Sequence, residues 1–450
     1  MRGTNFLSVL KIRNFLVFSV GQTISQFGDK LDHMALLALL RIYAPGPGAL
    51  SQLAIAFTLP VLIFGPTSGV LVDRWNRKRV LITCDFLRAV LVIFIPFAIL
   101  WTNGNVHSVY SIVFVVFLFG LFFNSAKMSI IPNLVSKKRL LAANSVNNFV
   151  GRFATLCGVL LGGLLVDWEG WGRVGWEGWR AGFYLDSLTY LVSAILLASI
   201  GIRVVRRSQV SSEERRPANN RGNGLWGFFA TAFRSLARDL FETFPLIVRD
   251  RAILFVMLSI LLFCFVGGSV YVLVVPLVQQ SLGRGTAGVG LLAGAAAIGM
   301  MLSSFAFGML GYRLEKRQVI LVGFAVIGVL MMIFAKASSF VFLGVISFLG
   351  GSMLAPIAIS QDTLLHEVVP EFFRGRIFST REWTLNGVFM LSAVLLGVLA
   401  ELISIRPVLF SVGLIVLVLS LAGEFVRGRW PGSSEGAASE LHVQPKSSHD

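Results

Sequence analysis

The sequence has few charged residues for its length. Charged side chains make up 14% of its 450 residues, whereas 55% of the residues are hydrophobic. A soluble domain typically has about 25% charged residues. The scarcity of charge therefore argues against a soluble globular protein, and the 38 phenylalanines favour a protein with many membrane spans.

Cysteines and nucleotide-binding patterns are also scarce. The sequence has three cysteines, Cys84, Cys157 and Cys264, and no Cys-x-x-Cys pair. We therefore expect neither a disulfide framework nor a zinc site. The sequence contains no GxxxxGK[ST] loop and no pairing of a nucleophile with a base. We predict that the protein is not an enzyme and uses no cofactor or metal.

The net charge of +16 raises the possibility of a nucleic-acid partner. The cations, however, lie in short loops between apolar runs, so we expect no nucleic acid. The basic loops include "DRWNRKR" (73–79), "SKKR" (136–139), "RLEKR" (313–317) and "RGR" (374–376). Because cations accumulate on the cytoplasmic side, this pattern predicts a multi-pass protein of the bacterial inner (plasma) membrane with both termini in the cytoplasm.

Apolar runs of about 20 residues, the length that crosses a bilayer, occur twelve times. The predicted fold class is therefore an all-α polytopic membrane protein. The predicted spans are 15–41, 51–72, 80–101, 109–131, 142–166, 180–201, 252–281, 287–311, 318–336, 340–365, 380–403 and 407–427.

The middle of the chain divides these spans into two sets of six. We predict an N-terminal half at 1–201, a cytoplasmic linker at 202–250, a C-terminal half at 251–427 and a disordered cytoplasmic tail at 428–450. Within the linker, apolar residues recur at helical spacing between Leu225 and Phe244, which predicts an amphipathic helix.

The two halves share a sequence landmark. "GVLVDRWNRKRVL" (69–81) follows span two and "GMLGYRLEKRQVI" (308–320) follows span eight, and Gly69 aligns with Gly308. Six spans, a linker and six spans with the same landmark indicate an internal duplication, which is known in secondary transporters.

With this landmark the sequence resembles the major facilitator superfamily, whose loop signature is Gly-x-Leu-x-Asp-Arg-x-x-Arg-Lys-Arg. The resemblance covers about residues 10–427 and implies two pseudo-symmetric six-helix halves around a cavity. "GQTISQFGDKLDHMALLALL" (21–40) and "RGRIFS" (374–379) resemble a branch with macrolide and siderophore exporters and the lysophospholipid transporter. "GVLLGG" (158–163) resembles an antiporter motif, with Val159 in place of proline.

The resemblance implies a conformational latch on the cytoplasmic side. In it, Gly69 would let helices approach closely and Asp73 would pair with a cation across the two halves. Tyr312 replaces the aspartate in the second copy, so we assign the charged latch to the first half. The predicted latch residues are Gly69, Asp73, Arg74, Arg77, Lys78, Arg313 and Arg376.

A polar stripe runs along the first span. Relative to Asp29, a helix places Gln22, Ser25, Gln26, Asp32 and His33 within about 60°, and Lys30 about 100° away. An ionisable residue at membrane depth is a functional candidate. The predicted residues for binding substrate or protons are Asp29, Asp32, His33, Gln26, Lys30 and, from a polar face on span five, Asn148 and Arg152.

Other polar features have simpler interpretations. Asp85 and Arg88, one turn apart, are expected to form a structural pair, while Lys127 is expected to snorkel or pair and Asp186 to lie at the interface. The repeat "WEGWGRVGWEGW" (168–179) favours an interfacial loop, with a lid over a cavity as the alternative.

Two functional hypotheses follow. The first is a secondary active transporter that exports amphipathic or hydrophobic small molecules by alternating access, in exchange for protons bound at Asp29. The second is a lysophospholipid transporter, in which Asp29 and Lys30 grip a zwitterionic headgroup. We expect a monomer surrounded by membrane lipids, and a polar stripe disfavours a non-transporting scaffold.

Overall fold

The computed structural model describes residues 7–136, 139–201, 238, 244–245, 247–311, 314–369 and 374–427. The predicted amphipathic helix of the linker lies almost entirely outside these residues, as do the predicted tail and Arg313. Throughout the described ranges the regular structure is helical, which confirms the predicted all-α class.

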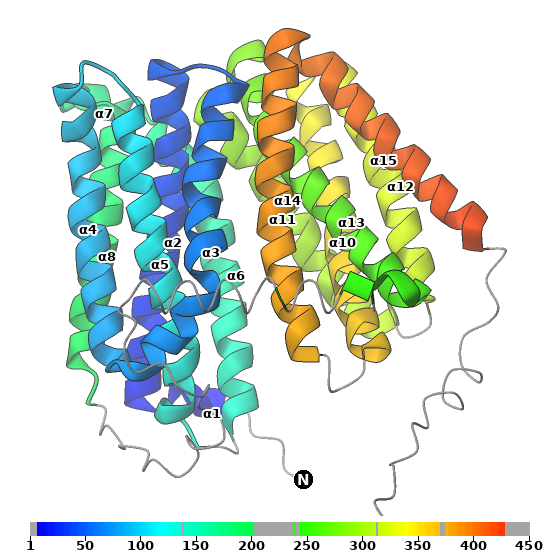
Figure 1. Cartoon of the computed structure of the whole chain (residues 1–450). Coiled ribbons are helices and arrows are strands. Elements are labelled where there is room, and N and C mark those ends of the chain that lie inside the picture. The colour runs from blue at the N-terminus through cyan, green and yellow to red at the C-terminus, as the bar shows by residue number, and fades with distance from the viewer. Residues whose placement is uncertain are drawn as a thin grey trace, which may run out of the picture.

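The helices form two bundles, drawn blue to cyan and green to red in Figure 1. The first contains α1 Leu7–Leu10, α2 Arg13–Tyr43, α3 Pro47–Arg74, α4 Arg77–Trp101, α5 His107–Leu134, α6 Leu140–Val166, α7 Gly170–Arg173 and α8 Gly178–Ser199. The second contains α10 Arg251–Ser269, η2 Val270–Val274, η3 Leu277–Ser281, α11 Gly285–Leu310, α12 Lys316–Lys336, α13 Phe340–Val368, α14 Arg374–Leu402 and α15 Ile405–Arg427.

Twelve long helical segments correspond to the twelve predicted spans. Among the described residues, eleven are long and apolar enough to cross a membrane by length and composition. The remaining one, α2, has 31 residues but carries the ionisable residues Asp29, Lys30, Asp32 and Arg41. The largest difference from prediction is at α14, which begins six residues before the predicted 380 because a helix continues into polar residues beyond the apolar run.

Glycines set the close packing of α2 within the first bundle. Gly21 and Gly28, seven residues apart, face α8, where an added Cβ at Gly28 would clash with Asp186 and Thr189. On the other side of α2, Gly158 of α6 lies against Lys30, with an added Cβ 2.7 Å from the Lys30 Cβ. Small residues therefore let α2 lie close to both neighbours.

The two bundles contact each other along α3 with α14 and along α6 with α11. The backbone N–H of Gly48 donates to Glu401 over 2.9 Å, and farther along the same helices the Trp383 indole donates to the Leu62 carbonyl over 3.2 Å. Beyond Leu62, the exposed Gly69 has nothing within 4 Å of an added Cβ. Among the described residues, the close approach expected at Gly69 is thus absent from this conformation.

Asp167 fastens the bundles at the end where they meet. Its carboxylate accepts from the Ala287 backbone N–H over 2.7 Å, in the first turn of α11, and from Arg41 over 3.4 Å. A carboxylate is favourable at a helix N-terminus. We call this end of the molecule the Asp167 end and the opposite end, where α3 runs into α4, the Asp73 end.

The crossing of α6 and α11 near the Asp167 end depends on two glycines. An added Cβ at Gly163 would lie 2.9 Å from the Thr286 carbonyl oxygen and 3.0 Å from the Gly290 Cα.

We predict that Gly163→Val forces the bundles apart at this end. In a cysteine-free background, thiol labelling of Thr286→Cys, which replaces a fully buried residue, should rise several-fold. The matched control is Gly172→Val in α7, where an added Cβ meets nothing within 4 Å, and equal labelling in both variants would contradict the prediction.

Candidate functional site

An ion pair lies at the middle of α2. Asp29 is one residue past the midpoint of this helix, and its Oδ1 accepts hydrogen bonds from the Arg88 guanidinium and from the Tyr190 hydroxyl. The guanidinium also lies over the Tyr190 ring, 4.1 Å from the centroid. These contacts join α2, α4 and α8 through one charged group, because a buried cation needs compensating partners.

Three further carboxylates surround this pair. Asp85 is completely buried, with one oxygen 3.7 Å from Arg88. Asp186 is also completely buried and accepts from the Thr189 hydroxyl over 3.1 Å. Asp32, 5% exposed, lies one helical turn from Gly28 on α2. The sequence predicts a local structural pair for Asp85 and Arg88 and an interfacial position for Asp186, but the structure joins all three to the Asp29 cluster.

A polar cavity of about 200 Å³ opens in front of the ion pair. Its wall combines one carboxylate, three cations, amides and hydroxyls. The lining residues are Gln22, Ser25, Gln26, Asp29, Lys30, Arg88, Gly120, Phe123, Asn124, Lys127 and Thr155. Gln22 is 1% exposed, and neither its amide nitrogen nor its amide oxygen has a hydrogen-bond partner among the described residues. A wall of this kind can bind a polar or charged group, because an unsatisfied buried amide gains from a partner.

The residues of the predicted polar stripe on α2 face three different sets of neighbours. Gln26 lies against Gly151 of α6, while Asp32 is buried on the side of α8. His33 lies outside the polar cavity and faces Tyr271 and Phe57, with ring centroids 5.7 and 6.4 Å away. The stripe covers about 120° of the helix, so its edges reach different neighbours. Of the seven residues of the stripe and its edge, five line the polar cavity and two, Asp32 and His33, do not; the five are Gln22, Ser25, Gln26, Asp29 and Lys30.

The His33 side chain belongs to an aromatic cluster between the two bundles. Phe57 of α3 lies 5.7 Å from Tyr271 and 5.9 Å from Phe389 of α14, measured between ring centroids. Tyr271 lies in the π-helical segment η2, a type of irregularity common at functional sites. The cluster therefore fills the interface near the middle of the molecule, on the Asp167 side of the Asp29 cluster.

The two candidates on α6 are separate from this cavity. Asn148 and Arg152 are exposed on α6 and do not line it. Thr155, one turn beyond Gly151 on the predicted polar face, does line it. The binding role of Asn148 and Arg152 stays a prediction.

The latch residues lie at the Asp73 end and contact their own bundle. Asp73 pairs with Arg77 over 3.2 Å, and Arg77 also donates to the Ser129 carbonyl over 2.9 Å. Lys78 donates to the Ala198 and Ile200 carbonyls, each over 2.7 Å. The side chains of Arg74 and Arg376 lie outside the described part. A latch across the two halves stays a prediction for a conformation in which this end is closed.

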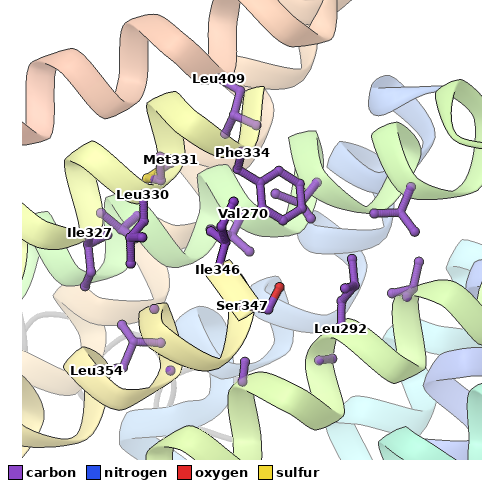
Figure 2. A pocket seen from close by; sticks show the side chains of 18 residues that line it. Val270, Leu292, Ile327, Leu330, Met331, Phe334, Ile346, Ser347, Leu354 and Leu409 are labelled. Carbon is purple, nitrogen blue, oxygen red and sulfur yellow. The ribbon is translucent and has the colours of Figure 1, made fainter. Parts of the chain in front are cut away.

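The second bundle contains a cavity of opposite character. It also measures about 200 Å³, and Ser347 is the one residue with a polar side chain among its 18 lining residues. Figure 2 shows aliphatic side chains such as Leu292, Ile327 and Leu354 converging on it, together with Phe334. The second bundle thus contains an apolar cavity, while the charged cluster belongs to the first bundle.

The comparison with known proteins identifies the family. The family description Major Facilitator Superfamily matches residues 18–284 and 256–444. The chain belongs to the major facilitator superfamily. It is a multi-pass membrane transporter and not an enzyme, and the predicted family and twelve-helix fold are confirmed.

Two Bacillus subtilis relatives show how far the similarity extends. The uncharacterised MFS-type transporter YkuC is 24% identical over 59% of this chain and 57% of its own length, so that match spans little more than half of the relative. BacE, named for bacilysin export, is 23% identical over 89% of this chain and 90% of its own length. Shorter matches, 27% identical, reach the lysophospholipid transporter LplT of Cronobacter sakazakii, over 35% of this chain and 38% of LplT, and macrolide efflux protein A of Streptococcus pyogenes, over 28% and 31%.

A solved structure agrees in fold. A bacterial homologue of the human lysosomal transporter Spinster, in an inward-facing and unoccupied conformation, superposes with a TM-score of 0.69. It is 14% identical, and the match covers 95% of this chain and 98% of the homologue. At this identity the similarity establishes the fold alone.

Two residues of the cluster were not predicted as site residues from the sequence: Tyr190 was not singled out, and Arg88 was expected only to pair with Asp85. Tyr190 contributes the second hydrogen bond to Asp29, and it is 1% exposed. The spacing in the sequence gave a partial indication of Tyr190, since Asp186 and Tyr190 lie four residues apart on α8 and so share one helical face. What the sequence lacked was the rotation of α8 relative to α2, which the glycine contacts determine.

We predict that Arg88→Met destabilises the protein strongly, because Asp29 and Asp85 would lose their shared cation. Breaking a buried ion pair on one side typically costs about 3–5 kcal/mol, and the one-third exposure of Asp29 places the expected loss near the lower limit. Thermal unfolding of the purified protein in detergent measures the loss. The control is Arg381→Met, whose partner Asp362 is 53% exposed and whose ion pair should contribute at most about 1 kcal/mol. Equal losses in the two variants would contradict the prediction.

Proposed function

We propose that the protein is a proton-coupled exporter of amphipathic or hydrophobic small molecules that works by alternating access. The observation that carries this proposal is the ion pair of Asp29 and Arg88 on the wall of a polar cavity at the middle of α2. Charged groups at membrane depth are costly and mark substrate or proton pathways. The full-length similarity to BacE, a protein named for export, supports the direction.

The proposed cycle uses the two ends of the molecule in turn. We assign the Asp73 end to the cytoplasm, because its loop "DRWNRKR" is rich in cations. The contacts of Asp167 and Glu401 then close the outer end, and the present conformation faces inward. Substrate entering from the cytoplasm or inner leaflet meets Asp29 and Arg88. Its polar group competes for that ion pair, while apolar side chains of the second bundle accommodate its hydrophobic part.

Asp29→Asn tests this proposal. The amide leaves Arg88 without its closest charged partner, so substrate has no ion pair to compete for, and efflux driven by a proton gradient should fall to the background of empty vesicles. The measurement is export of a macrolide from proteoliposomes with an imposed pH gradient. Asp362→Asn, which removes a carboxylate on α13 outside the cluster, should retain wild-type export. Full proton-driven export by Asp29→Asn would refute the role of this carboxylate.

A second candidate function is lysophospholipid transport. It is favoured by the composition of the cavity, whose wall includes Asp29, Lys30 and Lys127, so that a zwitterionic headgroup has a partner for each of its charges. The partial similarity to LplT supports it. Uptake of labelled lysophospholipid that is independent of a proton gradient, without macrolide export, would favour this function over the first.

A further inference from the structure

The charges around the Asp29 cluster do not balance. Four carboxylates, Asp29, Asp32, Asp85 and Asp186, share the region with three cations. The cations are Lys30, Arg88 and Lys127. An uncompensated charge inside a membrane protein is costly, and a carboxylate removes its charge by taking up a proton. The region therefore favours at least one bound proton, and the contacts indicate where it lies.

Asp29 and Asp85 have a cation and the other two carboxylates do not. Arg88 forms ion pairs with Asp29 and with Asp85. In the part of the chain that the structure describes, no cation lies within 4.0 Å of Asp32 or Asp186. Among the described residues, Oδ2 of the completely buried Asp186 and Oδ1 of Asp32, which is 5% exposed, have no hydrogen-bond partner. Both oxygens of Asp85 also lack one there, but Asp85 has the Arg88 guanidinium 3.7 Å away. Asp32 and Asp186 thus each offer an unsatisfied oxygen.

The contact between α2 and α8 brings these two carboxylates to the same place. An added Cβ at Gly28 would clash with the carboxylate of Asp186, and an added Cβ at Gly182 would lie 2.8 Å from the Cβ of Ala35. The helices are antiparallel here, and Asp32 lies between Gly28 and Ala35 on α2. It therefore faces the turn of α8 that carries Asp186, and the two side chains interact electrostatically.

We infer that the coupling proton is held between Asp32 and Asp186, behind the substrate-facing pair of Asp29 and Arg88. One proton on either carboxylate forms an O–H bond, removes one of two adjacent charges and donates a hydrogen bond to the oxygen that lacks a partner. The proton comes from water and returns to water, so no other reactant is needed.

The surrounding charges explain how substrate would control this proton. Asp32 and Asp186 both interact with Asp29 of α2 and Arg88 of α4, and Thr189 donates to Asp186. Lys127 of α5 acts on Asp29, Arg88 and Asp85. When substrate disturbs the pair of Asp29 and Arg88, the field at Asp32 and Asp186 changes, and the proton is released. This step rests on the proposed function, whereas the proton site itself does not.

Infrared spectroscopy of the purified full chain tests the proton site without any substrate. At neutral pH the wild type should show the carbonyl stretch of a protonated carboxylic acid. Asp186→Asn and Asp32→Asn should each remove this band, whereas Asp29→Asn and the distant control Asp362→Asn should keep it. A band that survives both Asp186→Asn and Asp32→Asn, or that disappears in Asp29→Asn or Asp85→Asn, would overturn the assignment.

Two further readouts separate this inference from folding and from the proposed function. Because asparagine has the size of a neutral aspartic acid, Asp186→Asn should unfold at the wild-type temperature. In proteoliposomes it should retain exchange of labelled for unlabelled erythromycin but lose accumulation driven by a pH gradient by at least about tenfold. Gradient-driven export that persists in both Asp186→Asn and Asp32→Asn would overturn the inference and leave the proposed function intact. The expected infrared result without gradient-driven export in the wild type would instead refute the proposed function alone.

Discussion

The guanidinium of Arg88 is the group on which the first bundle depends. It is 7% exposed at the middle of the molecule, and Asp29, Asp85 and Tyr190 supply its partners from three helices. A cation so placed is tolerated only while these partners remain, because leaving one charge of a buried pair alone is more costly than removing both. The positions of α2, α4 and α8 are therefore coupled through electrostatics as well as through packing.

This coupling explains why glycines accompany the charges. Gly28 brings α2 against Asp186 and Thr189, and Gly158 brings α6 against Lys30. A larger side chain at either position would move α2 by more than the tolerance of a hydrogen bond. In the second bundle, where the cavity wall is aliphatic, side chains can shift without breaking directional bonds. The arrangement gives one bundle with fixed geometry and one with an adaptable surface, a division suited to binding protons on one side and varied apolar molecules on the other.

The sequence was most informative about features that depend on one segment alone. Length and hydropathy located the twelve helices, and the motif at Gly69 identified the family. Helical geometry also placed Gln22, Gln26 and Asp29 on one face, and all three line the polar cavity. The sequence did not predict how the helices pack against one another. Asp85 and Arg88 were predicted as a local pair because they are one turn apart, and only the packing of α2 and α4 against α8 shows that Arg88 pairs with Asp29. His33 was predicted as part of the polar stripe, yet it lies near the edge of that stripe and faces Tyr271 of the second bundle.

The partners of each carboxylate indicate which one is free to change its protonation. Asp29 is the most conspicuous acid in the sequence, but its Oδ1 already accepts from Arg88 and Tyr190. The Arg88 guanidinium and the Tyr190 hydroxyl thus compensate the charge of Asp29 directly. Asp32 and Asp186 each have an oxygen without a partner among the described residues, and unlike Asp29 and Asp85 neither has a cation within 4.0 Å there. In this proposal substrate binds at Asp29 and Arg88, whereas the proton is held by Asp32 and Asp186. The two sites are coupled through the charge of Arg88 and do not compete for one carboxylate oxygen.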